Sequence, residues 1–348
     1  MARARRSGGN PLFWLIVLVG FAALFAAAFF YSAIERPGPL ASNRAFMVER
    51  GATGAAIADT MEREGVITDA LLFRIANRIY AQGPIQAGEY SIPAGASVRQ
   101  VVEMMTSGQA LMHAITFPEG ITISAVMRII EESDVLTGDL PETPPEGSIL
   151  PDTYHVQRGM SRAALLQIMR DAHDRAVAEI WENRAPNLPI STPAELVNLA
   201  SLVERETGIG EERAMVAGVF VNRLRRPMRL ETDPTIIYGV CLRFPDRCND
   251  GRLVNAQGQR RTIRQSEIEL DTGYNTYRID GLPPTPIANP GRAALEATAN
   301  PATTEAIFFV ADGSGGHIFA NTLAEHQANV RRWREIEAER LAQQRGQR

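Results

Sequence analysis

One apolar segment near the N-terminus constrains this chain more than any other feature. Residues 11–34, PLFWLIVLVGFAALFAAAFFYSAI, contain no charged side chain. At about 1.5 Å per residue, a helix of this length crosses a hydrocarbon core of about 30 Å. The sequence therefore predicts a transmembrane helix, and with it a single-pass protein of the cytoplasmic (inner) membrane.

The charges that flank this segment predict its orientation. Arg3, Arg5 and Arg6 precede it, and an excess of positive charge marks the cytoplasmic side. We expect residues 1–10 in the cytoplasm and everything after residue 34 outside it, in the periplasm or its equivalent. A cleaved signal peptide is the alternative. The apolar run is longer than the roughly 7 to 15 residues of a signal core, which favours a retained anchor.

Composition excludes several classes of function. The 348 residues are 45% hydrophobic, enough for two or three packed units, and the net charge of −4 gives no basic surface for nucleic acid. All 36 basic residues are arginine, so lysine chemistry is excluded. The five histidines show no metal-binding spacing, and we expect neither metal nor cofactor. Cys241 and Cys248 lie close together and predict a small disulfide in an oxidising compartment.

Periodicity and turn residues predict an α+β protein with a small module and a larger domain. The first part reads as strand, helix, helix and strand, and resembles a LysM-type module, a fold that lies against glycan chains in wall-associated proteins. A spacer that binds nothing is the alternative. The predicted segments are a linker (35–44), the LysM-like module (45–112), a proline-rich connector (113–150), a catalytic α+β domain (151–330) and a charged helical tail (331–348).

One helix of the larger domain ends on two acids. In STPAELVNLASLVERETG, Thr192 is an N-cap with Pro193 in the first helical position, and Glu195 three residues after the cap predicts a capping box. Leucine and valine residues then recur at helical spacing, and we expect them to form a buried stripe: Leu196, Leu199, Leu202 and Val203. Gly208 or Gly210 would supply a left-handed end.

The two acids, Glu204 and Glu206, are predicted to differ in environment. Glu206 stacks on Leu202 and Val203, so its carboxyl should be partly desolvated at the negative end of the helix dipole. Both effects raise a carboxyl pKa, as a general acid requires. Glu204 is expected to be a solvated acid beside Arg205 and Arg213, and remains a second candidate acid. Two ordinary surface acids are the alternative.

The segments that follow mix tyrosine, asparagine, threonine and aspartate with prolines, a composition suited to binding sugars. We expect seven side chains to hold a glycan and developing charge: Thr232, Asp233, Tyr238, Tyr274, Asn275, Tyr277 and His317. Structural roles are the alternative for each, such as a turn at Asp233-Pro234, a core position for Tyr238 and a hairpin loop with an exposed His317.

Four stretches together carry a family resemblance. LASLVERET, VAGVFVNRLRRPMRLETDPTIIYG, YNTYRIDGLPPTPIANPG and FFVADGSGGHIF resemble, in order, the YceG-like endolytic murein transglycosylase family. The resemblance implies an enzyme that cleaves the β-1,4 bond from N-acetylmuramic acid to N-acetylglucosamine without water, inside nascent peptidoglycan strands. It implies 1,6-anhydromuramoyl products, Glu206 as the catalytic acid and then base, peptidoglycan strands as substrate and peptidoglycan synthases as partners in the membrane. It assigns no role to the cysteines, which lie in the insertion-like CLRFPDRCNDGRLVNAQGQRR.

Two other functions remain open on the sequence. A hydrolytic muramidase could use Glu206 as acid with Asp233 or Glu231 as its partner. A non-catalytic peptidoglycan-binding protein could use the LysM-like module and the aromatic-rich segments to recognise glycan.

Overall fold

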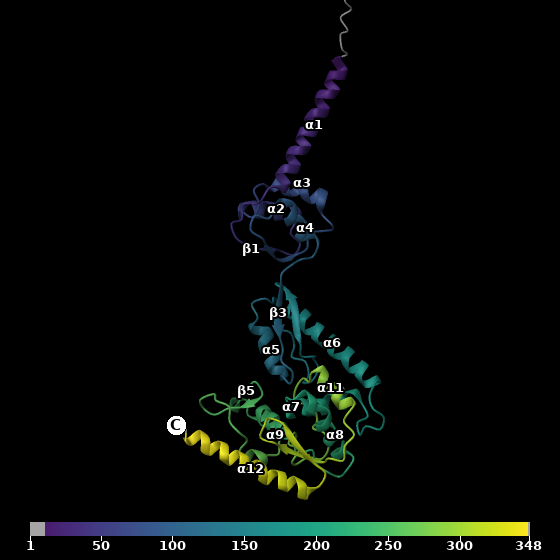
Figure 1. The fold of residues 1–348 in the computed structure, drawn as a ribbon, viewed down its shortest axis with the longest axis vertical. Coiled ribbons are helices and arrows are strands. Elements are labelled where there is room, and N and C mark those ends of the chain that lie inside the picture. The colour runs from purple at the N-terminus through teal and green to yellow at the C-terminus, as the bar shows by residue number, and fades with distance from the viewer. Residues whose placement is uncertain (1–10, 347–348) are drawn as a thin grey trace, which may run out of the picture. The chain divides into compact units, whose positions relative to one another are not determined.

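The structure is a computed structural model that describes residues 11–346 (Figure 1). The predicted cytoplasmic segment, residues 1–10, lies outside the described residues. Helices and two-stranded sheets make up the fold, which confirms the mixed α+β prediction. The chain divides into two compact units. Unit 1 runs to His113 and includes His155–Gly159, and unit 2 comprises Ala114–Tyr154 and the chain from Met160 onward. The segment predicted as a connector thus lies in unit 2 from Ala114 onward.

Helix α1, Pro11–Glu35, coincides with the predicted membrane span. It is long and apolar enough to cross a membrane, and its side chains are exposed along most of its length. Its last turn belongs to unit 1, because Ile34 is buried in the core of that unit and Glu35 pairs with Arg99 at 2.9 Å. An N-terminal signal sequence meets the same criteria of length and composition, so membrane anchorage and its orientation stay predictions.

The rest of unit 1 follows the predicted order of strand, helix, helix and strand. Side-chain caps mark the helix starts, since Thr53 accepts from Ala56 N, Asp69 accepts from Leu72 N, and Ser97 forms a capping box with Gln100. The resemblance to a LysM module stays a prediction. The elements are β1 (Arg44–Val48), α2 (Gly54–Arg63), α3 (Ala70–Tyr80), β2 (Gly88–Ile92) and α4 (Val98–Thr106), with β1 antiparallel to β2.

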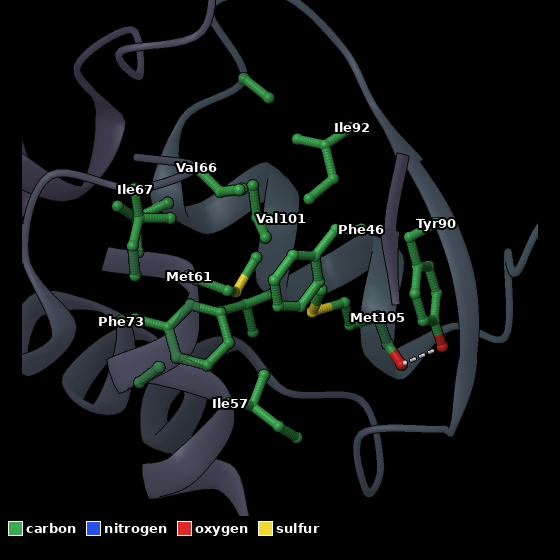
Figure 2. Close-up of a cluster of buried hydrophobic side chains, with 14 of the residues drawn as sticks. Phe46, Ile57, Met61, Val66, Ile67, Phe73, Tyr90, Ile92, Val101 and Met105 are labelled. Carbon is green, nitrogen blue, oxygen red and sulfur yellow. Dashed lines mark hydrogen bonds between the residues drawn. The ribbon is translucent and has the colours of Figure 1, made fainter. Parts of the chain in front are cut away.

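One hydrophobic cluster holds unit 1 together (Figure 2). Phe73 of α3 and Met61 of α2 are fully buried beside Phe46 of β1, and α4 contributes Val101 and Met105. The Tyr90 hydroxyl donates to the carbonyl oxygens of Gln86, at 2.8 Å, and Met105, at 3.3 Å. The polar end of this buried ring is therefore satisfied.

Unit 2 contains most of the helices of the chain. Strands β3 (Met112–Thr116) and β4 (Thr153–Gln157) form a two-stranded sheet in which the boundary between the units falls. The helices are α5 (Ile123–Glu132), α6 (Arg162–Glu182), α7 (Pro193–Glu206), α8 (Arg213–Leu224), α9 (Asp233–Arg243), α10 (Gln265–Ile268), α11 (Arg292–Ala299) and α12 (Leu323–Gly346), with the short 3-10 helices η1 (Gly210–Glu212) and η2 (Pro245–Arg247). Antiparallel pairs join β5 (Cys248–Asn249) to β6 (Arg252–Leu253) and β7 (Phe308–Ala311) to β8 (His317–Ala320).

Helix α7 is the central helix of unit 2 and packs against α6, α8, α9 and α11 (Figure 1). Its start has the predicted Thr192 cap, with Oγ1 accepting from Glu195 N at 3.2 Å. The Glu195 side chain accepts from Ser191 N and not from Thr192 N, so the expected capping box is only half formed. Every residue from 196 to 203 is buried, so the helix is enclosed on all sides and not only along the predicted stripe. Ser201 Oγ accepts from Ile287 N at 3.0 Å, which fastens the proline-rich segment after Leu282 to the helix.

The end of α7 differs from the prediction. The helix stops at Glu206 because Thr207 is extended, with φ −128°, and neither Gly208 nor Gly210 has a positive φ. Thr207 Oγ1 instead accepts from Ile209 N at 3.1 Å, a side-chain turn that ends the helix without a left-handed residue. Glu206 is thereby the last helical residue.

The core of unit 1 yields a direct test. Phe73→Ala should lower the opening free energy of the unit by about 3 to 5 kcal/mol, because it removes a fully buried ring and leaves a cavity. Native-state hydrogen exchange of amides in α2–α4 of the full chain in detergent measures this. Leu71→Ala on the same helix is the control, since Leu71 is 59% exposed and its loss should change little. Equal effects of both substitutions would contradict the placement of α3.

Candidate active site

Glu206 lies at the point where α7 leaves the core of unit 2. The residue is partly buried, and its Oε2 accepts a hydrogen bond of 2.5 Å from Thr232 Oγ1. No residue within 11–346 donates to its other oxygen, Oε1. Glu206 also lines a cleft of about 700 Å³. One carboxyl oxygen is thus fixed by the protein and the other is available to a ligand.

Three buried threonines determine where the Thr232 hydroxyl points. Thr232 N donates to Thr276 Oγ1 at 3.0 Å, and Thr235 Oγ1 donates to Thr232 O at 2.7 Å. The hydroxyls of Thr235 and Thr276 are 2.9 Å apart. Because the Thr235 proton is used on Thr232 O, Thr276 is left to donate to Thr235. All three are at most 1% exposed, so this network is shielded from water and stiff.

Arg223 of α8 fixes the chain that leads into Thr232. This buried side chain donates to Leu230 O at 2.9 Å and Arg229 O at 3.2 Å, and it pairs with Glu231 at 3.3 Å. Glu231 has φ +47°, a left-handed conformation that costs a non-glycine residue on the order of 1 kcal/mol. The surrounding contacts therefore impose an unfavourable backbone conformation directly before the residue that holds Glu206.

The environment of Glu206 favours its protonated form. Burial raises its pKa above the ordinary carboxyl value, and the charge of Asp233 acts in the same direction. The hydrogen bond from Thr232 and the charges of His317 and Arg223 oppose this rise without cancelling it. The expectation of a desolvated carboxyl at this position agrees with the structure.

Glu204 is not the solvated acid that we expected. Its side chain is only 5% exposed, with Oε1 3.3 Å from Arg213 Nη2 and Oε2 accepting from Gly291 N at 3.0 Å. The pairing with Arg213 was predicted, but the contact with Gly291 lies 87 residues away in the chain and could not be. Burial raises the pKa of Glu204 as well. Since it anchors the start of α11 and does not line the cleft, its position is that of a structural acid.

Asp233 and Tyr277 lie together beside Glu206. Asp233 begins α9 and lines the same cleft, and its Oδ1 accepts from the Tyr277 hydroxyl at 2.8 Å. Burial and the nearby Asp233 charge raise the pKa of Tyr277, so the phenol stays protonated and donates. Among the seven predicted binding residues, Thr232, Asp233 and Tyr277 are thus brought together around Glu206.

His317 reaches the site from the β7–β8 hairpin through Glu212. His317 Nδ1 lies 2.8 Å from Glu212 Oε2, and Thr207 Oγ1 donates to the same oxygen at 3.2 Å. An ionised carboxylate only accepts, so Nδ1 carries the proton. Burial acts to raise the pKa of Glu212, but the hydrogen bonds from His317 outweigh it and the pKa is lowered. The His317 side chain is 15% exposed and is not the exposed loop histidine of the alternative interpretation.

Tyr238 and Tyr274 belong to a different part of the unit. Their rings meet edge to face at 5.0 Å, and Tyr238 lines a second cavity of about 330 Å³ together with Glu146 and both cysteines. Burial raises the pKa of Glu146 to about 7, against hydrogen bonds from Ile123 N and Tyr238. Gly251 lines this cavity and the Glu206 cleft, so the turn between β5 and β6 is a wall of each.

Asn275 is fully buried and has a structural position. Its Nδ2 donates to Ile268 O at 2.8 Å and Leu270 O at 2.9 Å, and its Oδ1 accepts from Tyr277 N at 3.0 Å. These bonds use both N–H groups and one acceptor site of the amide, and the side chain has no exposed surface. Asn275 therefore positions Tyr277 and offers no polar atom to a ligand.

The cysteines form the predicted bond. Cys241, in the last turns of α9, is linked to Cys248 at the start of β5, with Cα atoms 5.4 Å apart. Within residues 11–346 no cluster of three or more histidine, cysteine or acidic side chains could hold a metal ion.

Sequence reasoning missed several residues that shape this site. Thr276, Arg223 and Glu212 act on Glu206 or its neighbours through contacts with distant segments, for which no local pattern exists. Glu146 was passed over inside the proline-rich segment, where it bonds to Asn289, 143 residues away, at 2.9 Å. One local signal was available: Thr232 and Thr235 lie one helical turn apart at the start of α9, a spacing that brings two side chains to the same face of a helix.

Two curated bacterial proteins are similar in sequence to this chain over most of its length. The "Endolytic murein transglycosylase" of Bacillus subtilis strain 168 is 26% identical over 310 residues, covering 80% of this chain and 81% of the relative. The protein of the same name from Streptococcus pneumoniae strain D39 is 24% identical over 330 residues, and the match spans 57% of its length and 81% of this chain.

A crystal structure of a yceG-like protein from Listeria monocytogenes is 24% identical and covers 82% of this chain and 99% of that one, with a TM-score of 0.49. The sequence profile of the YceG-like family matches residues 46–332, which is most of the chain. The chain therefore belongs to the YceG-like family.

Proposed function

We propose that the chain is a membrane-anchored endolytic lytic transglycosylase of peptidoglycan. It cleaves the β-1,4 bond between N-acetylmuramic acid and N-acetylglucosamine inside nascent glycan strands and leaves 1,6-anhydromuramoyl ends. The family match and the names of the relatives support the reaction class. The observation that carries the proposal is the Glu206 carboxyl, partly buried at a cleft of about 700 Å³ with one oxygen held by Thr232.

The mechanism requires one carboxyl in two roles. Protonated Glu206 donates its proton to the glycosidic oxygen as the bond from that oxygen to the muramoyl C1 breaks, and the N-acetylglucosamine end leaves with a free 4-hydroxyl. The resulting carboxylate takes the proton of the muramoyl 6-hydroxyl while O6 bonds to C1. Glu206 is then protonated again, and no water is consumed. A raised pKa suits the first step, and the hydrogen bond from Thr232 stabilises the carboxylate needed for the second.

The neighbouring groups fit supporting roles. The Asp233 carboxylate, held by the Tyr277 hydroxyl, lies in the cleft where positive charge develops at C1. The Thr207, Glu212 and His317 network fixes the residue that follows Glu206. We propose anchorage through α1 with unit 2 outside the cytoplasm, and peptidoglycan synthases of the same membrane as partners.

Removal of the acid tests the central assignment. Glu206→Gln should lower the rate of cleavage by about 10² to 10⁴, because general acid and base assistance is lost. Release of anhydromuramoyl fragments from sacculi, measured by mass spectrometry with the full chain, gives the rate. The variant should unfold at the same temperature as the parent or higher at pH 7. A carboxyl with a raised pKa makes the folded protein less stable as pH rises through that pKa, and the neutral amide of glutamine does not ionise.

Glu204→Gln is the matched control on the same turn. It should keep most of the cleavage activity, because Glu204 pairs with Arg213 and does not line the cleft. Normal cleavage by Glu206→Gln, or abolished cleavage by a well-folded Glu204→Gln, would exclude the assignment. Reducing ends in place of anhydro ends would indicate a hydrolytic muramidase, and binding with no cleavage would indicate a binding protein.

The Thr232 hydrogen bond predicts a change in pH dependence. It lowers the pKa of Glu206, so Thr232→Val should raise that pKa further. Cleavage that needs protonated Glu206 falls as pH rises through this pKa, and the basic limb of kcat/KM should therefore move to higher pH in the variant. Thr153→Val, at an exposed threonine, is the control and should leave the limb in place. If the basic limb of the pH profile stays at the same pH in both variants, the limb reflects the titration of a group other than Glu206.

A further inference from the structure

We infer that arginines on the wall of the Glu206 cleft form an anion site, and that this site binds carboxylates carried by the muramoyl lactyl ether of the substrate. We call Arg205, Arg252 and Arg260 the arginine wall. The inference rests on the proposed function for the identity of the ligand, and it adds which part of the glycan is recognised.

The three side chains lie near one another and line one cleft. Arg205 is the residue before Glu206 on α7, and Arg252 lies on β6. Arg260 pairs through an isolated antiparallel β-bridge with Val254, the residue after β6. Burial lowers the pKa of Arg205, and the positive charges of Arg252 and Arg260 lower it further, against the opposing charges of Glu204 and Glu146. Arg205 is thus a partly buried positive charge beside two exposed ones, Arg252 and Arg260, and a bound anion would offset part of the cost of its burial.

None of the three is neutralised by an ion pair within the described part of the chain. Arg205 donates to two carbonyl oxygens, Gly120 O at 3.1 Å and Gly251 O at 3.5 Å. Arg252 and Arg260 form no side-chain hydrogen bond or ion pair with residues 11–346. The neighbouring Arg261, which also lines the cleft, differs because Glu267 binds it with two bonds of 2.7 and 2.8 Å. The wall thus has unpaired guanidinium groups next to one that the protein has already satisfied.

The segment that carries Arg252 and Arg260 is fastened at several points. The disulfide ties Cys248 to α9, and Asp250 at the β5–β6 turn pairs with Arg128 of α5 at 2.7 Å. Arg261 N donates to Leu253 O at 3.0 Å, and its guanidinium is held by the buried Glu267. A loop held at these points needs little ordering of its backbone when its arginines bind a ligand.

The chemistry of the proposed substrate supplies the anion. Each muramoyl residue carries a lactyl ether that ends in a carboxylate, or in a peptide that has carboxylates of its own. Guanidinium groups bind carboxylates with paired, charge-assisted hydrogen bonds. A glycan without such groups offers only neutral hydroxyl and amide oxygens, which bind guanidinium more weakly. Because the wall adjoins Glu206, a carboxylate bound there would set which muramoyl residue is presented to the acid.

The test uses the full chain and three glycan strands of equal length. Their lactyl ethers end in a free carboxylate, in a carboxylate-bearing peptide, or in a neutral methyl amide. The double variant Arg252→Gln/Arg260→Gln is compared with Arg225→Gln/Arg226→Gln, which removes the same charge at exposed positions away from the cleft. Cleavage is measured as kcat and KM.

The wall variant should lose about 10- to 100-fold in kcat/KM on a carboxylate-bearing strand, mainly through KM, as expected for one or two charge-assisted hydrogen bonds. Its loss on the neutral strand should be at least about ten times smaller, and the control variant should lose little on any strand. The strand that shows the loss identifies the source of the carboxylate. An equal loss on all three strands, or none on any, would overturn the inference.

A binding measurement separates this inference from the proposed function. Calorimetric titration of the same glycan strands into the Glu206→Gln chain, with and without the wall substitutions, measures the affinity of each strand. It shows whether the arginine wall binds carboxylates even if no glycosidic bond is cut. Tighter binding of carboxylate-bearing strands that depends on Arg252 and Arg260 supports the wall whatever the reaction is. Equal affinity for charged and neutral strands would contradict it.

Discussion

The enclosure of α7 is the constraint on which the rest of unit 2 depends. Four helices pack against it, and all its residues from 196 to 203 are buried, so the helix cannot rotate or slide without disrupting the core. Arg205 and Glu206, the last two residues of the helix, are where it reaches an open cleft. The partial desolvation of Glu206 follows from the packing of the helix, because a carboxyl one turn beyond Leu202 and Val203 cannot be fully hydrated.

The second half of the site comes from a different segment that is rigid for other reasons. Arg223 binds the backbone before Thr232, and Thr276 binds Thr232 itself, so the hydroxyl that contacts Glu206 is positioned without help from a ligand. A preorganised donor needs no rearrangement during reaction, which is where much of the electrostatic benefit of an active site lies. The strained φ of Glu231 shows that this positioning is maintained against a local backbone preference.

Local signals in the sequence predicted what is local in the structure. The Thr192 cap, the buried leucines of α7 and the Cys241–Cys248 bond depend on residues near in sequence, and all are present. We predicted a solvent-exposed Glu204, because the spacing of residues along a helix does not show that Gly291 N, from a distant segment, donates to its carboxyl. The prediction that a glycine ends α7 was also wrong, because a side-chain turn at Thr207 ends the helix instead. The family resemblance added the reaction class, which no spacing could supply.

The disulfide has a consequence for when the cleft is complete. A bond between two thiols survives in oxidising surroundings and is reduced in the cytoplasm. Without the bond, the β5–β6 segment would be held by the pairs of Arg128 with Asp250 and of Arg261 with Glu267. This wall of the cleft therefore has all of its fastenings only in oxidising surroundings.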